Sequence, residues 1–271
     1  MKALKATMVM ETKRPIETAS LEAWAVRTRL FKVGDELAPF VIDALGSRHL
    51  VDGDVLAVTS KIVSLAERAL TPRTEPKLDV VMREADQYLG EGGFGVHLTV
   101  KHGLLLPSAG IDESNAEGDF YILLPQDPFA SAKALWNALR LHYKIHHLGI
   151  LITDSHTQPL RRGVTGISLA HWGFGATQDL VGKTDLYGRP FRMTSVNAAD
   201  ALSATAVFLM GEGTEPCPLA VLRGARLEFR PETDPNEVRI PLEEDLYRPL
   251  FSGANSRAIS AGPATAGTSS I

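Results

Sequence analysis

The stretch His147-Leu148-Gly149-Ile150-Leu151-Ile152-Thr153-Asp154-Ser155-His156-Thr157 decides the fold, and it continues through Pro159 and two arginines to Gly163. It begins as a short apolar run of the length that a fully buried strand uses, and the run stops at an acidic residue and a hydroxyl. Open α/β sheets bind ligands at the carboxyl ends of their strands, so Asp154 is a candidate ligand-binding residue. The alternative is a plain Asx-type turn, in which Asp154 caps its own loop.

The composition is that of an ordinary globular protein. The chain has 271 residues, 44% of them hydrophobic and 22% charged, with a formal net charge of −4. It can bury a substantial core as one large domain or two smaller ones. The charge balance gives no case for binding nucleic acid or an anionic membrane.

No apolar run approaches the ~20 residues that span a bilayer, and the first residues carry too short an apolar patch for a secretory signal. The single cysteine, Cys217, excludes an intrachain disulfide and a cysteine metal cluster. We expect it to act as a small apolar residue between two prolines. The predicted setting is cytoplasmic.

The chain divides into a loose arm at residues 1–20, a main region at 21–251, which could form two subdomains, and a low-complexity tail at 252–271. Within the main region, hydrophobic patterns and turn residues predict a series of elements. The strands are expected at 21–31, 55–59, 96–100, 119–124, 163–170 and 218–223. The helices are expected at 37–44 with Asp35 as N-cap, around 80–89, after Asp127-Pro128, and at 198–210 with Asn197 as N-cap. The last helix is apolar almost all round, which predicts that it is buried.

Ser60 and Lys61 follow the predicted strand at 55–59. A hydroxyl donor beside a lysine point charge can bind phosphate. The same pair can be a helix N-cap followed by a solvated lysine.

Asp112, Glu113, Ser114 and Asn115 stand together after an apolar segment. Four consecutive oxygen-bearing side chains suit hard cations such as magnesium or manganese. The alternative is a polar turn before Gly118.

Glu212 lies between Gly211 and Gly213, just after the predicted helix at 198–210. A loop of small residues with one carboxylate can wrap a nucleotide–metal unit. It can also be a glycine C-cap with no ligand.

Four stretches together resemble the coenzyme F420-0:L-glutamate ligase family, the γ-glutamyl ligases of deazaflavin biosynthesis. They are Thr59-Ser60-Lys61-Ile62-Val63-Ser64, Ala109-Gly110-Ile111-Asp112-Glu113-Ser114-Asn115, Ile152-Thr153-Asp154-Ser155-His156 and Met210-Gly211-Glu212-Gly213. The resemblance covers residues 26–223, and the second and third stretches are specific in combination.

The resemblance implies a mixed α/β (α+β) protein that forms an intertwined homodimer. It also implies coupling of GTP hydrolysis to amide formation between L-glutamate and a substrate carboxylate, with two divalent ions (Mg²⁺ or Mn²⁺) and often potassium. Asp112 and Asp154 would hold the first metal, and Ser155 and Glu212 the second. Ser60, Lys61, Asn115, Gly211 and Gly213 would contact the nucleotide. Such ions would assist a reaction through an acyl phosphate, because they offset the negative charge on phosphate oxygens.

The chain departs from the family pattern at three places. Leu65 stands where the family has a nucleotide-binding lysine, residues 28–31 replace an early Leu-Pro pattern that touches guanine, and residues 107–109 replace a Cys-Ala-Asn. In the stretches at 154–157 and 210–215 the chain is more similar to a side branch associated with folate metabolism. The acceptor (F420-0 or a folate-like carboxylate) and the choice between GTP and ATP therefore stay open.

Two rival functions remain beside the ligase. One is a nucleotide- and metal-binding homologue without turnover, which Leu65 and the altered N-terminal pattern favour. The other is a purely structural homodimer, which leaves the four polar stretches without an explanation.

Overall fold

A five-stranded sheet forms the centre of the protein, which we describe from a computed structural model covering residues 20–114, 118–251 and 257–258. The strand order is β1-β12-β2-β8-β9. The strands are β1 (Glu22–Val26), β2 (Asp54–Thr59), β8 (Leu148–Thr157), β9 (Val164–Trp172) and β12 (Leu219–Arg223). The pair β2–β8 is parallel, and the other neighbours are antiparallel. The mixed α/β fold class is therefore confirmed.

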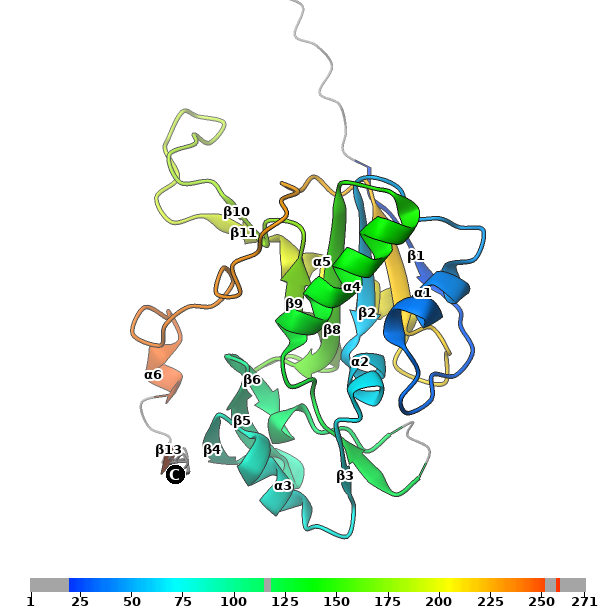
Figure 1. The fold of residues 1–271 in the computed structure, drawn as a ribbon. Coiled ribbons are helices and arrows are strands. Elements are labelled where there is room, and N and C mark those ends of the chain that lie inside the picture. Colours follow the sequence, from blue (N-terminus) through cyan, green and yellow to red (C-terminus); the bar gives the residue numbers. More distant parts are fainter. Residues whose placement is uncertain (1–19, 115–117, 252–256, 259–271) are drawn as a thin grey trace, which may run out of the picture.

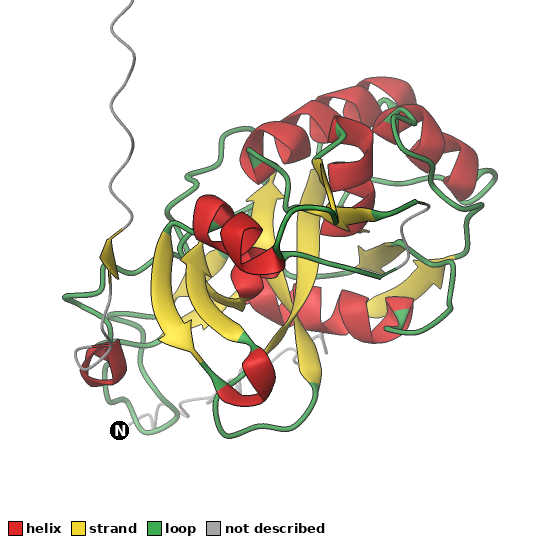
Figure 2. Ribbon diagram, turned by 90° about the horizontal axis from the view of Figure 1, so that it is seen from below, coloured by secondary structure: helices red, strands yellow, loops and turns green. Residues whose placement is uncertain are grey.

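Helices cover both faces of this sheet (Figures 1 and 2). On one face, α1 (Leu37–Leu45), α2 (Ser60–Glu67) and α4 (Pro128–Tyr143) pack on alternate strand residues such as Leu56 and Ile150. On the other face, α5 (Ala198–Met210) packs on Val55, Ala57 and Leu151. Two buried faces explain why β2 and β8 read as continuous apolar runs.

The packing of α5 on β9 explains a glycine in the predicted strand. A Cβ on Gly166 would lie 2.3 Å from the Ser203 carbonyl oxygen, so only glycine allows this approach of helix to sheet. The helix begins as predicted, because the Asn197 side chain accepts a hydrogen bond from the Asp200 backbone N–H. It is not buried all round, since Phe208 is 85% exposed.

A second, smaller layer lies beside the carboxyl end of β2. It contains a sheet in the order β13-β4-β5-β6, a two-stranded pair β3–β7, and a helix. The elements are β3 (Leu70–Pro72), α3 (Lys77–Glu84), β4 (Gln87–Glu91), β5 (His97–Lys101), β6 (Leu104–Pro107), β7 (Phe120–Ile122) and β13 (Arg257–Ala258), with single 3-10 turns at Gly93–Gly95 and Ser108–Gly110.

Two expected elements in the first half of the chain differ from the structure. The helix predicted at 80–89 is wrong at its second half, because α3 ends at Glu84 and the next residues pair with β5 as β4. Asp35 does not cap α1, since its carboxylate accepts hydrogen bonds from Arg29 and from the Lys32 backbone N–H.

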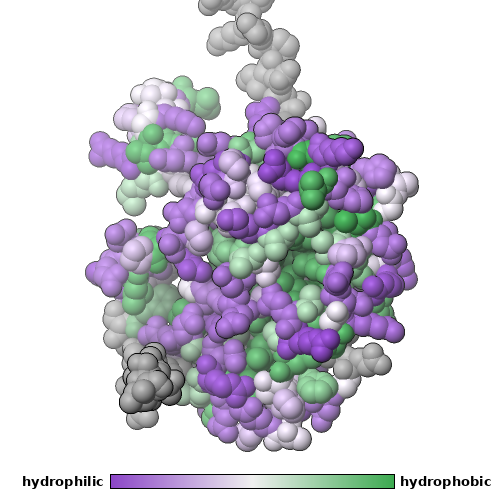
Figure 3. Space-filling view, in the orientation of Figure 1, coloured by the Kyte–Doolittle hydropathy of each residue, from purple (hydrophilic) through white to green (hydrophobic). Residues whose placement is uncertain are grey.

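An arm extends from the main body between β10 (Thr177–Asp179) and β11 (Ser195–Asn197) (Figure 1). The chain then returns past β12 to a short helix, α6 (Arg248–Phe251). Figure 3 shows hydrophilic side chains over most of the visible face, with hydrophobic ones in smaller patches. None of the helices in the described ranges is long and apolar enough to cross a membrane. The predicted arm at 1–20 and tail at 252–271 fall almost wholly outside the described residues.

Candidate functional site

The carboxyl ends of β2 and β8 form the floor of a cavity. These strands are parallel and in register, with Thr59 opposite Thr153, so the residues that follow each strand emerge side by side. Ser60 and Lys61 follow β2 at the start of α2, and Asp154 and Ser155 continue β8. The cavity has a volume of about 380 Å³, within the range of small-molecule sites.

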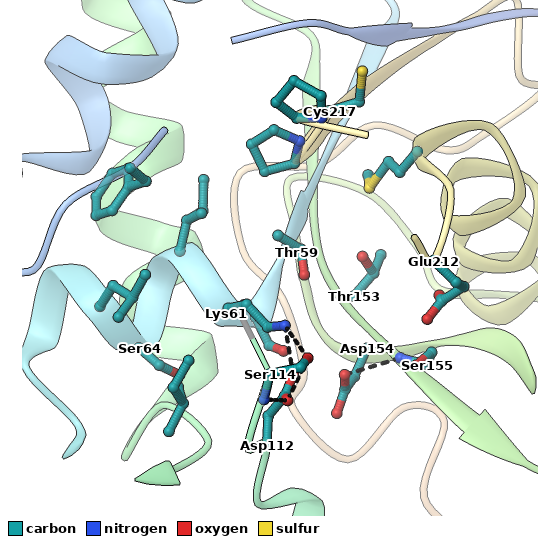
Figure 4. Close-up of a pocket in the computed structure, with 18 of the residues that line it drawn as sticks. Thr59, Lys61, Ser64, Asp112, Ser114, Thr153, Asp154, Ser155, Glu212 and Cys217 are labelled. Atoms are coloured by element: carbon teal, nitrogen blue, oxygen red, sulfur yellow. Dashed lines mark hydrogen bonds and ion pairs between the residues drawn. The ribbon is translucent and has the colours of Figure 1, made fainter. Parts of the chain in front are cut away.

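The other two predicted motifs contribute further walls of the same cavity. Asp112 and Ser114 come from the loop before β7, and Gly211, Glu212 and Gly213 come from the loop after α5. Figure 4 shows Asp112 and Asp154 on opposite sides of the cavity floor, with Glu212 above Ser155. The structure thus brings together eight of the nine predicted site residues, and the ninth, Asn115, lies outside the described residues.

Asp112 has partners for both carboxylate oxygens. The Lys61 ammonium lies 2.6 Å from Oδ2, and the backbone N–H and hydroxyl of Ser114 donate to Oδ1 at 2.6 and 2.8 Å. Burial alone would raise the pKa of Asp112, but these hydrogen bonds and the Lys61 charge lower it overall. Asp112 is therefore anionic and held in one orientation.

Asp154 is in the opposite situation. Its hydrogen-bond donor is the adjacent Ser155 N–H, at 2.9 Å. Burial raises the pKa of Asp154 to about 7, and the charges of Asp112 and Glu212 add to this rise, against Lys61 and the Ser155 bond. Around Asp154, the negative charges of Asp112 and Glu212 therefore outweigh the positive charge of Lys61.

Glu212 is placed by the end of α5. Gly211 terminates the helix with a φ of 81°, which glycine adopts without strain. A Cβ on Gly211 would meet the carboxyl group of Glu215 at 2.8 Å, and that group accepts a hydrogen bond from the Gly213 N–H. This tight loop leaves the Glu212 side chain exposed at the cavity rim.

The oxygen donors fit a hard divalent cation. Carboxylates with a serine hydroxyl are typical ligands of Mg²⁺ and Mn²⁺, and a cation would relieve the excess negative charge that raises the pKa of Asp154. In the described residues, no three His, Cys, Asp or Glu side chains are already arranged to hold a metal ion. Such an ion would thus bind with Ser155, phosphate oxygens or water completing its shell.

Two predictions about neighbouring residues need correction. The four consecutive oxygen-bearing residues do not act together, because Glu113 pairs with Lys77 on α3 and does not line the cavity. Ser60 is not an N-cap, since Thr59 holds that position and Ser60 is the first residue of α2. Lys61 is not a solvated lysine either, as its side chain is 23% exposed and paired.

The structure gives several residues of the cavity contacts or positions that the sequence patterns did not assign. Ser114 binds both Asp112 and Lys61, and its spacing of two from an aspartate is the signal of an Asx-turn. Residues 28–32 and Leu65 line the far end of the cavity, and Cys217 lines it beside Pro216. Arg161, Arg162 and Lys183, basic residues that could bind phosphate, are not among the described residues that line this cavity.

This geometry defines a class of protein, which is a mixed α/β fold with an acidic cavity at the carboxyl ends of two parallel strands. Comparison with known proteins is more specific. The family model described as F420-0:Gamma-glutamyl ligase matches residues 69–224. The chain therefore belongs to the F420-0:gamma-glutamyl ligase family.

Individual relatives agree with this assignment. The chain is 32% identical over 241 residues to the coenzyme F420:L-glutamate ligase of Methanopyrus kandleri, covering 81% of this chain and 94% of the relative. It is 33% identical over 237 residues to the protein of the same name from Archaeoglobus fulgidus, covering 81% and 92%. The corresponding protein of Methanocaldococcus jannaschii is 29% identical over 259 residues, covering 89% and 100%.

Proposed function

We propose that the protein is a ligase that joins the amine of L-glutamate to a carboxylate of a cofactor, F420-0 or a folate-like acceptor, at the expense of GTP. Family membership and the names of the relatives support glutamate ligation. The observation that carries the proposal is the cavity itself, where Lys61 and three carboxylates surround a space at the ends of β2 and β8. Because Leu65 and residues 28–31 depart from the family pattern of nucleotide contacts, ATP is the alternative nucleotide to test.

The cavity offers a binding partner for each charged part of such a reaction. Lys61 and Ser60, in the first turn of α2, would hold the nucleotide phosphates, and the Gly211–Gly213 loop would lie beside the nucleotide. Asp112 and Asp154 would hold one divalent ion, and Ser155 and Glu212 a second, with potassium as a further cation. Bound cations would supply positive charge to the phosphate oxygens during transfer.

The reaction would proceed in two steps, phosphorylation of the acceptor carboxylate and then attack by the glutamate amine. An oxygen of the acceptor carboxylate attacks the terminal phosphorus, the bond to the bridging oxygen breaks, and the nucleoside diphosphate leaves. The uncharged glutamate amine then attacks the acyl carbon, phosphate departs with the electrons of the C–O bond, and the nitrogen loses a proton. The chain's own residues hold and orient the reactants, which accounts for much of the rate in phosphoryl transfer.

The test measures phosphate release from GTP and from ATP in the presence of Mn²⁺ and L-glutamate, with F420-0 or a folate monoglutamate as acceptor. Mass spectrometry of the acceptor follows each reaction. We expect a gain of one or more glutamyl units on one acceptor, with phosphate released in equal amount. Nucleotide and metal binding without phosphate release or mass gain would overturn the proposal and favour a binding protein without turnover.

We also propose that the protein is a homodimer. The arm between β10 and β11 exposes large hydrophobic side chains in a region that packs little against its own chain, among them Leu186 at 100%, Tyr187 at 85% and Met193 at 90%. Exposed apolar groups of this kind mark protein interfaces. Light scattering should give twice the chain mass, and the Leu186→Asp, Tyr187→Asp double variant should give the chain mass. A monomeric wild-type protein would contradict this.

A further inference from the structure

The Lys61–Asp112 ion pair occupies one of the oxygens that a metal would need. Lys61 Nζ lies 2.6 Å from Asp112 Oδ2 and donates a hydrogen bond of 3.2 Å to Ser114 Oγ (Figure 4). Ser114 donates to the other oxygen, Oδ1, through its backbone N–H and its hydroxyl. A divalent cation on Oδ2 would therefore repel the Lys61 ammonium and compete with it for that oxygen.

Lys61 has a flexible, charged side chain at a position where a phosphate is expected. Its charge sits at the end of a flexible four-carbon stem, on the first turn of α2, where backbone N–H groups favour anions. Asp154 and Glu212 line the same cavity, and Lys61 is the cation that pairs with Asp112 there. A phosphate oxygen would compete with Asp112 Oδ2 for the close contact with the Lys61 ammonium, because each contact draws the same positive charge toward itself.

We propose that Lys61 is a built-in counter-ion that exchanges partners. In the nucleotide-free protein it holds Asp112, and when a nucleotide binds it moves to a phosphate oxygen and frees Oδ2 for a divalent cation. The inference rests on the proposed function, because it takes a nucleoside triphosphate or diphosphate as the ligand. It adds a consequence, which is that nucleotide and cation bind cooperatively. A nucleotide draws Lys61 away from Asp112 and so opens the cation site, and a cation on Asp112 leaves Lys61 available for the phosphate.

The exchange has a thermodynamic signature that simple phosphate binding lacks. If Lys61 competes with the cation, removing it should tighten cation binding when no nucleotide is present. If Lys61 serves the phosphate alone, its removal should weaken nucleotide binding and leave the affinity for the free cation unchanged. Linkage also requires that the cation and the nucleotide change each other's affinity by the same factor.

The experiment measures Mn²⁺ binding by the loss of the free-ion electron paramagnetic resonance signal, with and without GDP. Lys61→Met keeps the length of the stem and removes the charge. Without nucleotide we expect it to bind Mn²⁺ about fivefold more tightly or better than wild type, the lower end of typical coupling between two sites. The enhancement of Mn²⁺ affinity by GDP should shrink by a similar factor.

Two further variants separate the contact from general effects. Lys61→Arg keeps the charge and can pair with a carboxylate through two N–H groups, so Mn²⁺ binding without nucleotide should not tighten. Lys32→Met removes a positive charge from another residue that lines the same cavity, whereas the cation paired with Asp112 is Lys61, so Mn²⁺ affinity should stay as in wild type. Melting curves confirm that each variant is folded.

The proposal is overturned if Lys61→Met binds Mn²⁺ as wild type does, or if Lys32→Met tightens binding as much as Lys61→Met. A protein with the expected Mn²⁺ affinities that adds glutamate to no acceptor overturns the proposed ligase function and leaves the exchange of partners standing.

Discussion

The two ends of strand β2 carry charged residues in opposite states. At the amino end, Asp54 is fully buried, and its two oxygens accept hydrogen bonds from the Arg223 guanidinium at 2.7 and 2.8 Å and from the Val51 N–H. At the carboxyl end, Lys61 faces a cavity with three carboxylates. We call the amino end, where Asp54 pairs with Arg223, the closed end. We call the carboxyl end, where negative charge around Asp154 exceeds positive charge, the open end.

This difference separates charge that maintains the fold from charge that is available to a ligand. A buried carboxylate with all its partners in the chain has nothing left to bind, and removing a partner exposes the cost of burying it. Carboxylates that lack enough positive charge around them gain most when a cation or substrate arrives. Substitutions at the two ends should therefore change different quantities.

The largest expected effect is on activity at the open end. Asp154→Asn keeps the shape of the side chain and removes a proposed ligand of the cation, so kcat/KM for glutamate ligation should fall on the order of a thousandfold, because such ions supply several kcal/mol. The melting temperature should stay the same or rise, since the substitution removes a repelling charge. Unchanged ligation rates in Asp154→Asn would remove Asp154 from the cation site.

At the closed end the effect should be on stability. Arg223→Met leaves the Asp54 carboxylate buried without its cation, and we expect the free energy of unfolding to fall by about 3 kcal/mol. Asp54→Asn should cost less, about 1 kcal/mol, because the Arg223 side chain is 38% exposed and can turn to water. Denaturant titrations measure both values. Equal losses in the two variants, or a loss of catalysis in folded Asp54→Asn, would break the distinction between the ends.

The pH dependence of stability sharpens the comparison further. In the metal-free folded protein the pKa of Asp154 is raised from 3.8 to about 7, so between these values the folded chain binds more protons than the unfolded chain. Stability should therefore fall as pH rises through this window, and the loss should be complete above pH 7. We expect a loss of roughly 2 kcal/mol, because the half-buried carboxyl keeps contact with water.

The measurement compares unfolding of wild type and Asp154→Asn in the presence of a chelator at pH values from 4 to 8. The difference between the two curves isolates Asp154 from other titrating groups. Added Mn²⁺ should restore stability at the upper end, since it selects the ionised carboxylate. Parallel curves would show that Asp154 titrates at its ordinary pKa.

The sequence predicted the open end well and the closed end poorly. Strand patterns and polar residues directly after strands are local signals, so Ser60, Lys61, Asp154 and Ser155 could be placed at strand ends before the structure was known. Asp54 directly precedes the predicted strand at 55–59 and was given no role, because its partner Arg223 lies 169 positions away in the chain. No local pattern reports a pairing over that distance.

The errors in secondary structure come from contacts with neighbouring segments of the chain. Hydrophobic residues at 80–89 continue a helical spacing, yet the chain turns extended at Ala85 and joins β5. Asp35 is a good capping residue in a good position, but Arg29 and the Lys32 N–H engage its carboxylate first. In both cases a contact with a neighbouring segment outweighs a helical preference of well under a few kcal/mol.

The smallest expected effect concerns an uncharged residue of the open end. Cys217 lines the cavity, half-buried between two prolines, and if charged groups hold the reactants its thiol has no part in the reaction. Cys217→Ala should keep kcat/KM within about twofold and the free energy of unfolding within about 0.5 kcal/mol, as substitutions away from special features do. A bulky maleimide should inactivate the wild type by filling the cavity and should spare Cys217→Ala. A tenfold loss of activity in Cys217→Ala would show that the open end depends on more than its charges.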